Sequence, residues 1–444
     1  MTRIDLTQIA WIRSLLMSRW PQFLARAVTL AGFIFTIMAG LLGSVVGSHN
    51  LAIIFVWIAW WTALKLIFIP LGGRSWCSIC PIPMPGEWLQ RGGMIQPGTK
   101  GIGLNWRWPR MLRGNGLQAG GFLLIGLFGA VTLTSAQVTA WVLAGILLLA
   151  LGLSLVFERR SFCSYLCPIG GFTGLYAQAA PVEVRVKDAD ICASHAEKTC
   201  YTVCPWGQYP LALKTSANCG LCMECLRVCP SDNIAVNLRP WGSDLGGQGR
   251  HRLDETFLGL VMVASALIDS AIFLGPWGDL KMAAYAVGSQ EWLGFMAAFL
   301  LFALVLLPGL FALAVWGGLK LAGLKTGLRA ALAQQGQVLV PLGMMSWIAF
   351  TVSFAFVKLG YVLPVLSDPL GWGWNLLGIG GPAGVGETTT FGLLLQVLLL
   401  TIGLYWSSRV AGRITHTGRT NRQAIPLIGF AALVSVGMLW LLIG

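Results

Sequence analysis

The run Cys219-Gly-Leu-Cys222-Met-Glu-Cys225-Leu-Arg-Val-Cys229-Pro230 decides how the rest of this sequence is interpreted. Three cysteines recur at every third residue, a fourth follows after three intervening residues, and a proline ends the run. Thiolates hold a four-iron, four-sulfur (4Fe-4S) cluster with this spacing, and the proline turns the chain away after the last ligand. The run therefore predicts an iron–sulfur module.

A second, less regular run precedes the first and consists of Cys192, Cys200 and Cys204, with Pro205 after the last thiol. In modules with two clusters, the fourth cysteine of one run ligates the cluster of the other run. We therefore expect two 4Fe-4S clusters. The first would be held by Cys204, Cys219, Cys222 and Cys225, and the second by Cys192, Cys200 and Cys229.

The second cluster lacks a fourth thiol, and His195 stands at the spacing where that thiol is expected. Imidazole replaces thiolate on iron in Rieske centres, where it raises the reduction potential. His195 is therefore a candidate iron ligand. Two alternatives stay open: a three-iron cluster, or an ordinary solvated histidine in a polar loop.

The other four cysteines belong to an internal repeat. The blocks Arg74-Ser75-Trp76-Cys77-Ser78-Ile79-Cys80-Pro81-Ile82 and Arg160-Ser161-Phe162-Cys163-Ser164-Tyr165-Leu166-Cys167-Pro168-Ile169 each follow an apolar helical hairpin. Both hairpins would end on the same side of a membrane. A pseudo-twofold arrangement would then bring the two Cys-Pro blocks face to face and gather four thiolates.

We interpret Cys77, Cys80, Cys163 and Cys167 as a metal site that holds a third iron–sulfur cluster. Copper or zinc would also suit these soft ligands. A redox-active pair of thiols, or plain buried thiols, are the remaining alternatives.

The composition indicates a membrane protein. Of the 444 residues, 56% are hydrophobic and 11% are charged, against roughly 25% charged in a typical globular chain. A soluble globular chain and a disordered one are thereby excluded. Nine stretches are long and apolar enough to cross a bilayer, near residues 25–46, 51–70, 117–135, 138–157, 256–275, 292–316, 338–359, 390–408 and 424–443.

Basic residues orient these spans. Of the 30 Lys and Arg residues, 27 lie in the segments 1–26, 71–116, 158–255, 317–335 and 406–423. Since basic loops stay in the cytoplasm, we expect the N-terminus and all eleven cysteines to be cytoplasmic and the C-terminus extracytoplasmic, in a bacterial inner membrane. The net charge of +13 then reflects topology and anionic lipid, and no nucleic acid partner is expected.

The expected fold class is mainly α, a polytopic membrane protein with an inserted α+β two-cluster ferredoxin module. We place a cytoplasmic amphipathic N-terminus at 1–24, a four-span repeat with the two Cys-Pro blocks at 25–179, the ferredoxin module at 180–255 and a five-span domain at 256–444. Cysteines in the reducing cytoplasm favour metal or redox roles over structural disulfides.

Over residues 25–240, the four spans, two Cys-Pro blocks and two-cluster module together resemble the membrane polyferredoxins of the NapH and NosR type. The resemblance implies that electrons pass between the quinone pool and partner redox proteins, with the clusters on the cytoplasmic side. This chain departs from the short family members in having five further spans. Its first block also has two residues between the cysteines, where the family usually has three.

The last five spans contain neither cysteine nor histidine, and His49 is the only histidine near any span. A haem b held by two histidines is therefore not expected. Because ionisable groups inside spans are functional candidates by default, Asp269 is a candidate for a quinone or proton role, or else pairs with a neighbouring helix. Lys65 stands near a span end, where we expect its amine to reach the membrane surface.

The sequence thus predicts a membrane iron–sulfur protein that relays electrons between quinone and a redox partner, such as a cytochrome or reductase, as a subunit of a respiratory complex. Cofactors would carry this chemistry. Whether the chain is itself an enzyme, for example part of a quinol oxidoreductase complex, stays open. Two alternatives of other classes are a copper-handling or cofactor-maturation factor and a membrane redox sensor.

Overall fold

The computed structural model describes residues 3–96, 98, 100–247, 251–379, 390–415 and 421–443. The described chain is mainly helical with one small sheet, so the predicted fold class is confirmed. The chain forms two compact units. Unit 1 comprises Met1–Phe35, Ile67–Leu117 and Val142–Asp244, and unit 2 comprises Thr36–Leu66, Gln118–Trp141 and Leu245–Gly444.

Unit 1 contains all eleven cysteines and all the described strands. Its elements are β1 (Ile4–Asp5), α1 (Ala10–Met17), α5 (Ile69–Gly72), α6 (Ser75–Ile79), α7 (Met84–Arg91), α10 (Pro168–Tyr176), β2 (Val182–Val186), α11 (Ala189–Ser194), α12 (Thr199–Thr202), α13 (Glu224–Val228) and β3 (Ile234–Leu238). Short helical turns lie at Leu6–Gln8, Arg110–Leu112, Phe162–Leu166, Pro210–Ala212 and Ser216–Asn218.

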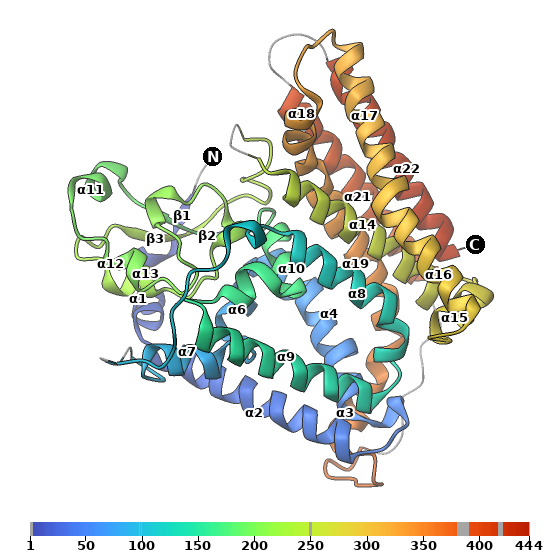
Figure 1. Cartoon of the computed structure of the whole chain (residues 1–444), viewed down its shortest axis with the longest axis horizontal. Coiled ribbons are helices and arrows are strands. Elements are labelled where there is room, and N and C mark those ends of the chain that lie inside the picture. The colour runs from blue at the N-terminus through green and yellow to red at the C-terminus, as the bar shows by residue number, and fades with distance from the viewer. Residues whose placement is uncertain are drawn as a thin grey trace. The chain divides into compact units, whose positions relative to one another are not determined.

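The sheet of unit 1 has the strand order β1-β3-β2, and both pairs are antiparallel. Val184 lies opposite Val236 in the register, and both pack with Leu221, Leu226 and Ile234 in one buried cluster. Helices α11 to α13 lie beside this sheet in Figure 1. The cysteine run that begins at Cys219 is therefore fastened to a small hydrophobic core.

The N-terminal segment is part of this module. Ile4 pairs with Leu238 of the central strand, and the guanidinium of Arg3 contacts the carboxylate of Glu183 at 2.9 Å. The backbone carbonyl of Leu16 accepts a hydrogen bond from Arg227 at 3.0 Å. Ile4–Asp5, within the segment 1–24 that the sequence predicts to be amphipathic, thus form an edge strand of this sheet.

Unit 2 consists of helices. Those wholly inside it are α3 (Leu51–Ile53), α4 (Trp61–Ala63), α14 (Leu253–Phe273), α15 (Gly278–Tyr285), α16 (Gln290–Leu301), α17 (Leu307–Leu321), α18 (Leu328–Gln335), α19 (Leu339–Lys358), α20 (Val362–Ser367), α21 (Thr390–Thr415) and α22 (Ala424–Ile443). Further helical turns lie at Gly47–His49, Ile54–Trp60, Phe302–Leu306, Gly336–Val338, Leu359–Tyr361 and Asn421–Gln423. Helix α19 packs against α14 and α21, and α22 packs against α17 and α21 (Figure 1).

Helices α2 (Trp20–Leu42), α8 (Gly116–Thr132) and α9 (Ala136–Val156), and the π-helical turn Leu64–Phe68, contain residues of both units. Eight helices in the described chain are long and apolar enough to cross a membrane: Trp20–Leu42, Leu51–Gly72, Ala136–Val156, Leu253–Phe273, Gln290–Leu321, Leu328–Ser367, Thr390–Thr415 and Ala424–Ile443. The remaining predicted span, at residues 117–135, corresponds to α8 (Gly116–Thr132), which is apolar but only 17 residues long. By helix composition this is a multi-pass membrane protein.

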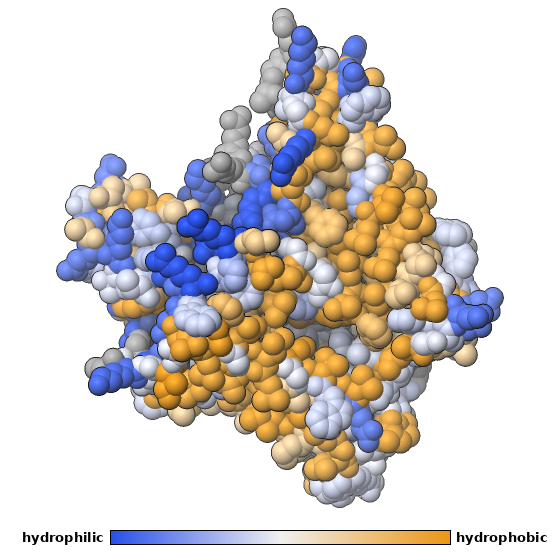
Figure 2. All heavy atoms as spheres, in the orientation of Figure 1, coloured by the Kyte–Doolittle hydropathy of each residue, from blue (hydrophilic) through white to orange (hydrophobic). Residues whose placement is uncertain are grey.

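Large apolar side chains cover outward faces of the unit 2 helices. Leu313 and Trp316 of α17 and Val436 and Trp440 of α22 are at least half exposed, and apolar colour dominates around these helices in Figure 2. Water-exposed patches of this kind are unfavourable for a soluble protein. Lipid contact accounts for them.

Candidate metal centre

The thiols of Cys204, Cys219, Cys222 and Cys225 lie along one cavity of about 370 Å³ in unit 1. Their sulfur atoms are close enough for the charge on one to affect the next. Burial, reinforced by the Cys204 thiol, raises the pKa of Cys222 to about 12. A thiol with this pKa keeps its proton at neutral pH unless a metal cation replaces it. This group of four thiols is called group A.

The backbone of group A is held in a strained conformation that directs amides at sulfur. Leu221 (φ 50°) and Met223 (φ 61°) are both in the left-handed region, which non-glycine residues rarely adopt and which clusters at functional sites. The amide of Leu221 donates to the sulfur of Cys219, and the amide of Glu224 donates to that of Cys222. Such bonds stabilise negative charge on sulfur and tune a bound cluster.

Three further thiols, those of Cys192, Cys200 and Cys229, form group B. Each interacts electrostatically with another member of the group. Asn233 donates hydrogen bonds to two of these thiols. Its backbone N–H donates to the sulfur of Cys229 at 3.2 Å, and its side-chain Nδ2 donates to the sulfur of Cys192 at 3.3 Å. The thiols that the cross-over rule assigns to each of two clusters thus interact with one another, and their role as cluster ligands stays a prediction.

His195 follows directly after α11, whose last turn carries Cys192. Its Nδ1 is buried and has no hydrogen-bond partner within the described chain. A buried ring nitrogen without a partner costs free energy, and this cost would be relieved if the nitrogen bound a metal ion. The site therefore fits a cluster with one imidazole ligand.

The two Cys-Pro blocks come together in unit 1. The thiols of Cys77, Cys80, Cys163 and Cys167, called group C, interact electrostatically with one another. Cys77 and Cys163 are buried, and the hydroxyl of Thr173 lies 3.4 Å from the sulfur of Cys77. Burial raises the pKa of Cys167 to about 11, so this thiol too requires a cation to become a thiolate at neutral pH.

The second Cys-Pro block shows why a proline follows the last cysteine. Cys167 is the N-cap of α10 and Pro168 is the first helical residue, a position at which proline loses no hydrogen bond. The sulfur of Cys167 accepts a hydrogen bond from the amide of Gly170 at 3.3 Å. Because a helix N-terminus favours negative charge, this geometry stabilises the thiolate form of Cys167.

None of the eleven cysteines forms a disulfide bond. Among the described residues, no three or more His, Cys, Asp or Glu side chains are arranged as ligands around a single metal ion.

A buried ion cluster supports group C. The Nε of Arg160 donates to Glu87 at 2.7 Å, and its Nη1 donates to the backbone carbonyl of Cys77 at 2.6 Å. Arg91 and Arg26 also contact the Glu87 carboxylate, at 3.2 and 3.7 Å. Burial alone would raise the pKa of Glu87, but the guanidinium groups, above all that of Arg160, lower it to about 2.

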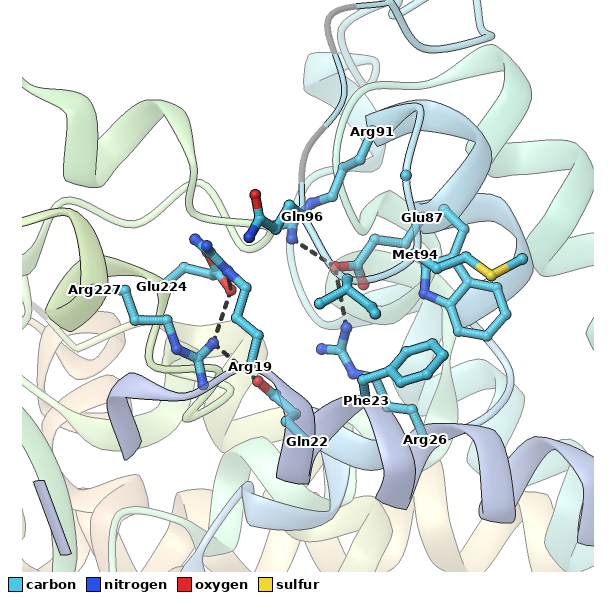
Figure 3. A pocket seen from close by; sticks show the side chains of 13 residues that line it. Arg19, Gln22, Phe23, Arg26, Glu87, Arg91, Met94, Gln96, Glu224 and Arg227 are labelled. Atoms are coloured by element: carbon cyan, nitrogen blue, oxygen red, sulfur yellow. Dashed lines mark hydrogen bonds and ion pairs between the residues drawn. The ribbon is translucent and has the colours of Figure 1, made fainter. Parts of the chain in front are cut away.

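Figure 3 shows Glu87 with Arg26 and Arg91, and near them a second set in which Glu224 contacts Arg19 and Arg227. Arg26 lies in α2 and Arg19 directly precedes that helix, whereas Arg227 lies in α13, which also carries Cys225 of group A. Arg227 also donates to the backbone carbonyl of Cys222 at 3.1 Å. Ion pairs thus fasten the start of the first span to the group A loop.

Trp206 contacts both group A and group C. Its indole lines the cavity of group A and packs in one buried cluster with Cys77, Cys163 and Cys167. The guanidinium of Arg74 lies 4.1 Å from the Trp206 ring centroid. Gly220 leaves room for the indole, since a Cβ at that position would lie 2.0 Å from its Nε1.

Sequence patterns did not single out Trp206, Asn233 or Glu87. Trp206 follows the Cys204-Pro205 pair directly, which was the available signal for a role in the site. Asn233 and Glu87 have no such signal, because their contacts to Cys192 and Arg160 join residues more than forty positions apart in the sequence.

Unit 2 contains Asp269, the remaining predicted site residue. It lines a separate cavity of about 480 Å³ whose other walls are mainly aromatic. The expectation that Lys65 reaches the membrane surface is wrong: the side chain is 2% exposed and lies against three aromatic rings. The Trp61 ring lies one turn before Lys65 in the same span, and the other two rings belong to α19, so the packing of α19 buries the amine.

Two segments of the chain match the family model of a 4Fe-4S binding domain, residues 53–100 and 139–186. Each segment contains one Cys-Pro block, so the predicted internal repeat coincides with two copies of one domain. The chain is also similar to the methylamine utilization ferredoxin-type protein MauN of Paracoccus denitrificans, with 27% identity over 156 residues that cover 32% of this chain and 52% of MauN.

A second relative is the ferredoxin-type protein NapH of Haemophilus influenzae, with 26% identity over 187 residues that cover 37% of this chain and 63% of NapH. The chain therefore spans between about half and two thirds of the length of these curated relatives. No solved structure matches. The chain thus carries two 4Fe-4S binding domain regions and is a distant homologue of the ferredoxin-type membrane proteins NapH and MauN.

Proposed function

We propose that this chain passes electrons between a membrane quinone and a redox partner protein, as one subunit of a respiratory complex. The observation that carries the proposal is that the thiols of groups A and C pack against one indole, that of Trp206. Two metal-binding groups that share a buried side chain are close neighbours, as a relay requires.

The residues fit iron–sulfur clusters in their donor chemistry. Groups A and C offer four thiols each, and group B offers three thiols and the unbonded Nδ1 of His195. We propose one 4Fe-4S cluster in each group. When bound, such clusters accept and release single electrons at a potential set by hydrogen bonds, charge and burial.

The chain's own residues contribute those three factors. Amides at Leu221, Glu224 and Gly170 donate to thiol sulfur and so stabilise added negative charge. Arg160 places a buried positive charge beside the backbone of Cys77. Burial of the thiols excludes water, which strengthens each of these electrostatic effects.

The quinone and the partner follow from the resemblance to membrane polyferredoxins, and the relatives' names support only a ferredoxin-type role. We propose a cytoplasmic position for all three groups, since they lie in two of the basic segments that the positive-inside rule assigns to that side.

The proposal is tested with anaerobically purified chain in liposomes that contain a quinol. The reduction of the iron centres by the quinol is followed by visible absorbance and by low-temperature EPR. Cys225→Ser in group A and Cys77→Ser in group C serve as controls for each other. Each substitution should remove the EPR signal of its own group and leave that of the other.

Quinol-dependent reduction that needs both groups supports an electron relay. Three results contradict it. Copper instead of iron in group C, with the copper lost in Cys77→Ser, would indicate metal handling, and reduction without turnover when a redox partner is added would indicate a sensor. The third is that quinol does not reduce the iron centres.

A further inference from the structure

An open cavity of about 420 Å³ in unit 2 uses none of the cysteines. Its volume lies within the roughly 300–1,000 Å³ of small-molecule sites. It is lined by two helices that pack against each other, α21 and α22. The lining residues are Ser408, Arg409, Gly412 and Arg413 of α21 and Ala424, Ile425 and Ile428 of α22. This cavity is called the arginine groove.

Arg409 and Arg413 bring two positive charges to the groove. They are four residues apart in one helix, so they lie on the same helix face. Both are exposed, and neither forms an ion pair or a side-chain hydrogen bond within the described chain. The sequence from 388 to 444 contains no Asp or Glu, so α21 and α22 supply no counter-charge. Positive charge of this kind attracts an anion.

The backbone around the two arginines shapes the groove. A Cβ added at Gly412 would meet nothing within 4 Å, so the absence of a side chain there keeps space open beside Arg413. A Cβ added at Gly246 would instead lie 2.8 Å from the Cβ of Arg413 and 3.1 Å from its Cδ. The stem of Arg413 therefore rests against the backbone of Gly246. A recess that is open before a ligand arrives costs less free energy to fill.

The helix lengths indicate how deep the groove lies in a membrane. Helix α21 has 26 residues and is about 39 Å long, which exceeds the hydrocarbon core of roughly 30 Å. Its two arginines lie in its last two turns, so they reach the headgroup level. Helix α22 has 20 residues and begins at Ala424. Ile425 and Ile428, which are 59% and 36% exposed, therefore lie where the acyl chains begin.

We infer that the arginine groove is a discrete site for one anionic phospholipid of the cytoplasmic leaflet, the side to which the basic segment 406–423 is assigned. Guanidinium groups donate paired hydrogen bonds to phosphate oxygens, so Arg409 and Arg413 hold the headgroup. The acyl chains continue along Ile425 and Ile428. A free anion such as phosphate gains nothing from this apolar wall. A zwitterionic lipid carries an ammonium group that the two arginines repel.

Binding is measured on the full chain in detergent by native mass spectrometry, with phosphatidylglycerol and with phosphatidylcholine of the same acyl chains. The wild type should bind one phosphatidylglycerol more tightly than phosphatidylcholine. Arg409→Gln and Arg413→Gln should each weaken this binding about fivefold, and the double variant roughly 25-fold. The matched control is Arg329→Gln, because Arg329 is exposed on α18 in another basic segment and does not line the groove. It should leave the affinity unchanged.

A second variant fills the groove and keeps every charge. Gly412→Leu places a side chain in the open space and should remove the tight phosphatidylglycerol site. Leucine is a better helix former than glycine, so this variant should fold. Its control is Gly437→Leu in α22, where an added Cβ also meets nothing within 4 Å but which does not line the groove. Gly437→Leu should bind the lipid as the wild type does.

Three results would overturn the inference. The first is equal binding of phosphatidylglycerol and phosphatidylcholine by the wild type. The second is wild-type affinity in either the double arginine variant or Gly412→Leu. The third is an equal loss in Arg329→Gln, which would indicate diffuse attraction between basic segments and anionic lipid. Inorganic phosphate is added as a competitor, and displacement of the lipid at equal concentration would assign the groove to a free anion instead.

Discussion

Substitution of Glu87 by glutamine tests whether the buried ion cluster supports the Cys-Pro blocks. The change removes the negative charge and keeps the shape of the side chain. It leaves Arg160, which contacts both Glu87 and the backbone of Cys77, without its buried counter-charge. We therefore expect the free energy of unfolding to fall and group C to lose its metal more readily.

The magnitude follows from the pKa of Glu87, which folding lowers from 4.5 to about 2. At about 1.4 kcal/mol per pKa unit, the shift corresponds to about 3 kcal/mol of stability at pH 7. The loss of one partner from a buried ion pair costs a similar amount, roughly 3–5 kcal/mol. For a unit of this size, the melting temperature should fall by roughly 6–12 °C.

The pH dependence has a definite sign. Because the pKa of Glu87 is lower in the folded chain, its contribution is complete above pH 4.5 and is lost as the pH falls towards 2. The difference between wild type and Glu87→Gln should therefore shrink from about 3 kcal/mol at pH 7 to about 1 kcal/mol at pH 3.

The assay is denaturant unfolding in detergent at both pH values, with the rate of iron loss to a chelator measured in parallel. Glu197→Gln is the control, because Glu197 is exposed in the group B loop. The reasoning would be refuted by a loss below about 1 kcal/mol at pH 7, or by equal losses at pH 7 and pH 3.

Three further substitutions probe single contacts. Gly220→Ala should displace the Trp206 indole and lower the iron content of groups A and C, whereas Gly116→Ala, which meets nothing within 4 Å, should not; equal iron in both variants would argue against a shared role of Trp206. Asn233→Ala removes a donor to the sulfur of Cys192 and should lower the midpoint potential of group B by on the order of 60 mV in an EPR titration, about 1.4 kcal/mol; an unchanged potential would count against that bond. His195→Cys should lower the group B potential and keep its iron, whereas His195→Ala should lose iron; identical spectra of both variants and the wild type would exclude His195 as a ligand.

The apolar spans were predictable because a membrane helix is encoded locally, in about twenty consecutive residues. The expected stretch at 256–275, for example, corresponds to Leu253–Phe273. The cysteine groups could also be proposed in advance, because the spacing in the run from Cys219 is set by the size of a cluster and the cross-over rule distributes the ligands between two clusters. That these groups ligate clusters stays a prediction.

Contacts between distant segments could not be predicted in this way. Ile4 and Asp5 form only a two-residue strand, and their partner β3 lies more than 220 residues later. Such a short strand carries no periodicity of its own. It forms because β3 offers an open edge, which a second strand covers.

Lys65 shows a different limit of the sequence. Its position near the end of an apolar stretch favoured a surface amine, but the rings of Trp347 and Phe350 come from another helix nearly three hundred residues later. Burial of Lys65 depends on that packing, which a single sequence does not encode in any local pattern.

The central claim is that the three thiol groups hold iron–sulfur clusters, and counting iron and acid-labile sulfide tests it most directly. The full chain is purified without oxygen, and both elements are measured per chain alongside Mössbauer spectra. The account predicts about twelve irons and an equal amount of sulfide per chain, and about eight irons would contradict a cluster in group C. A colourless chain with fewer than about four irons would contradict it.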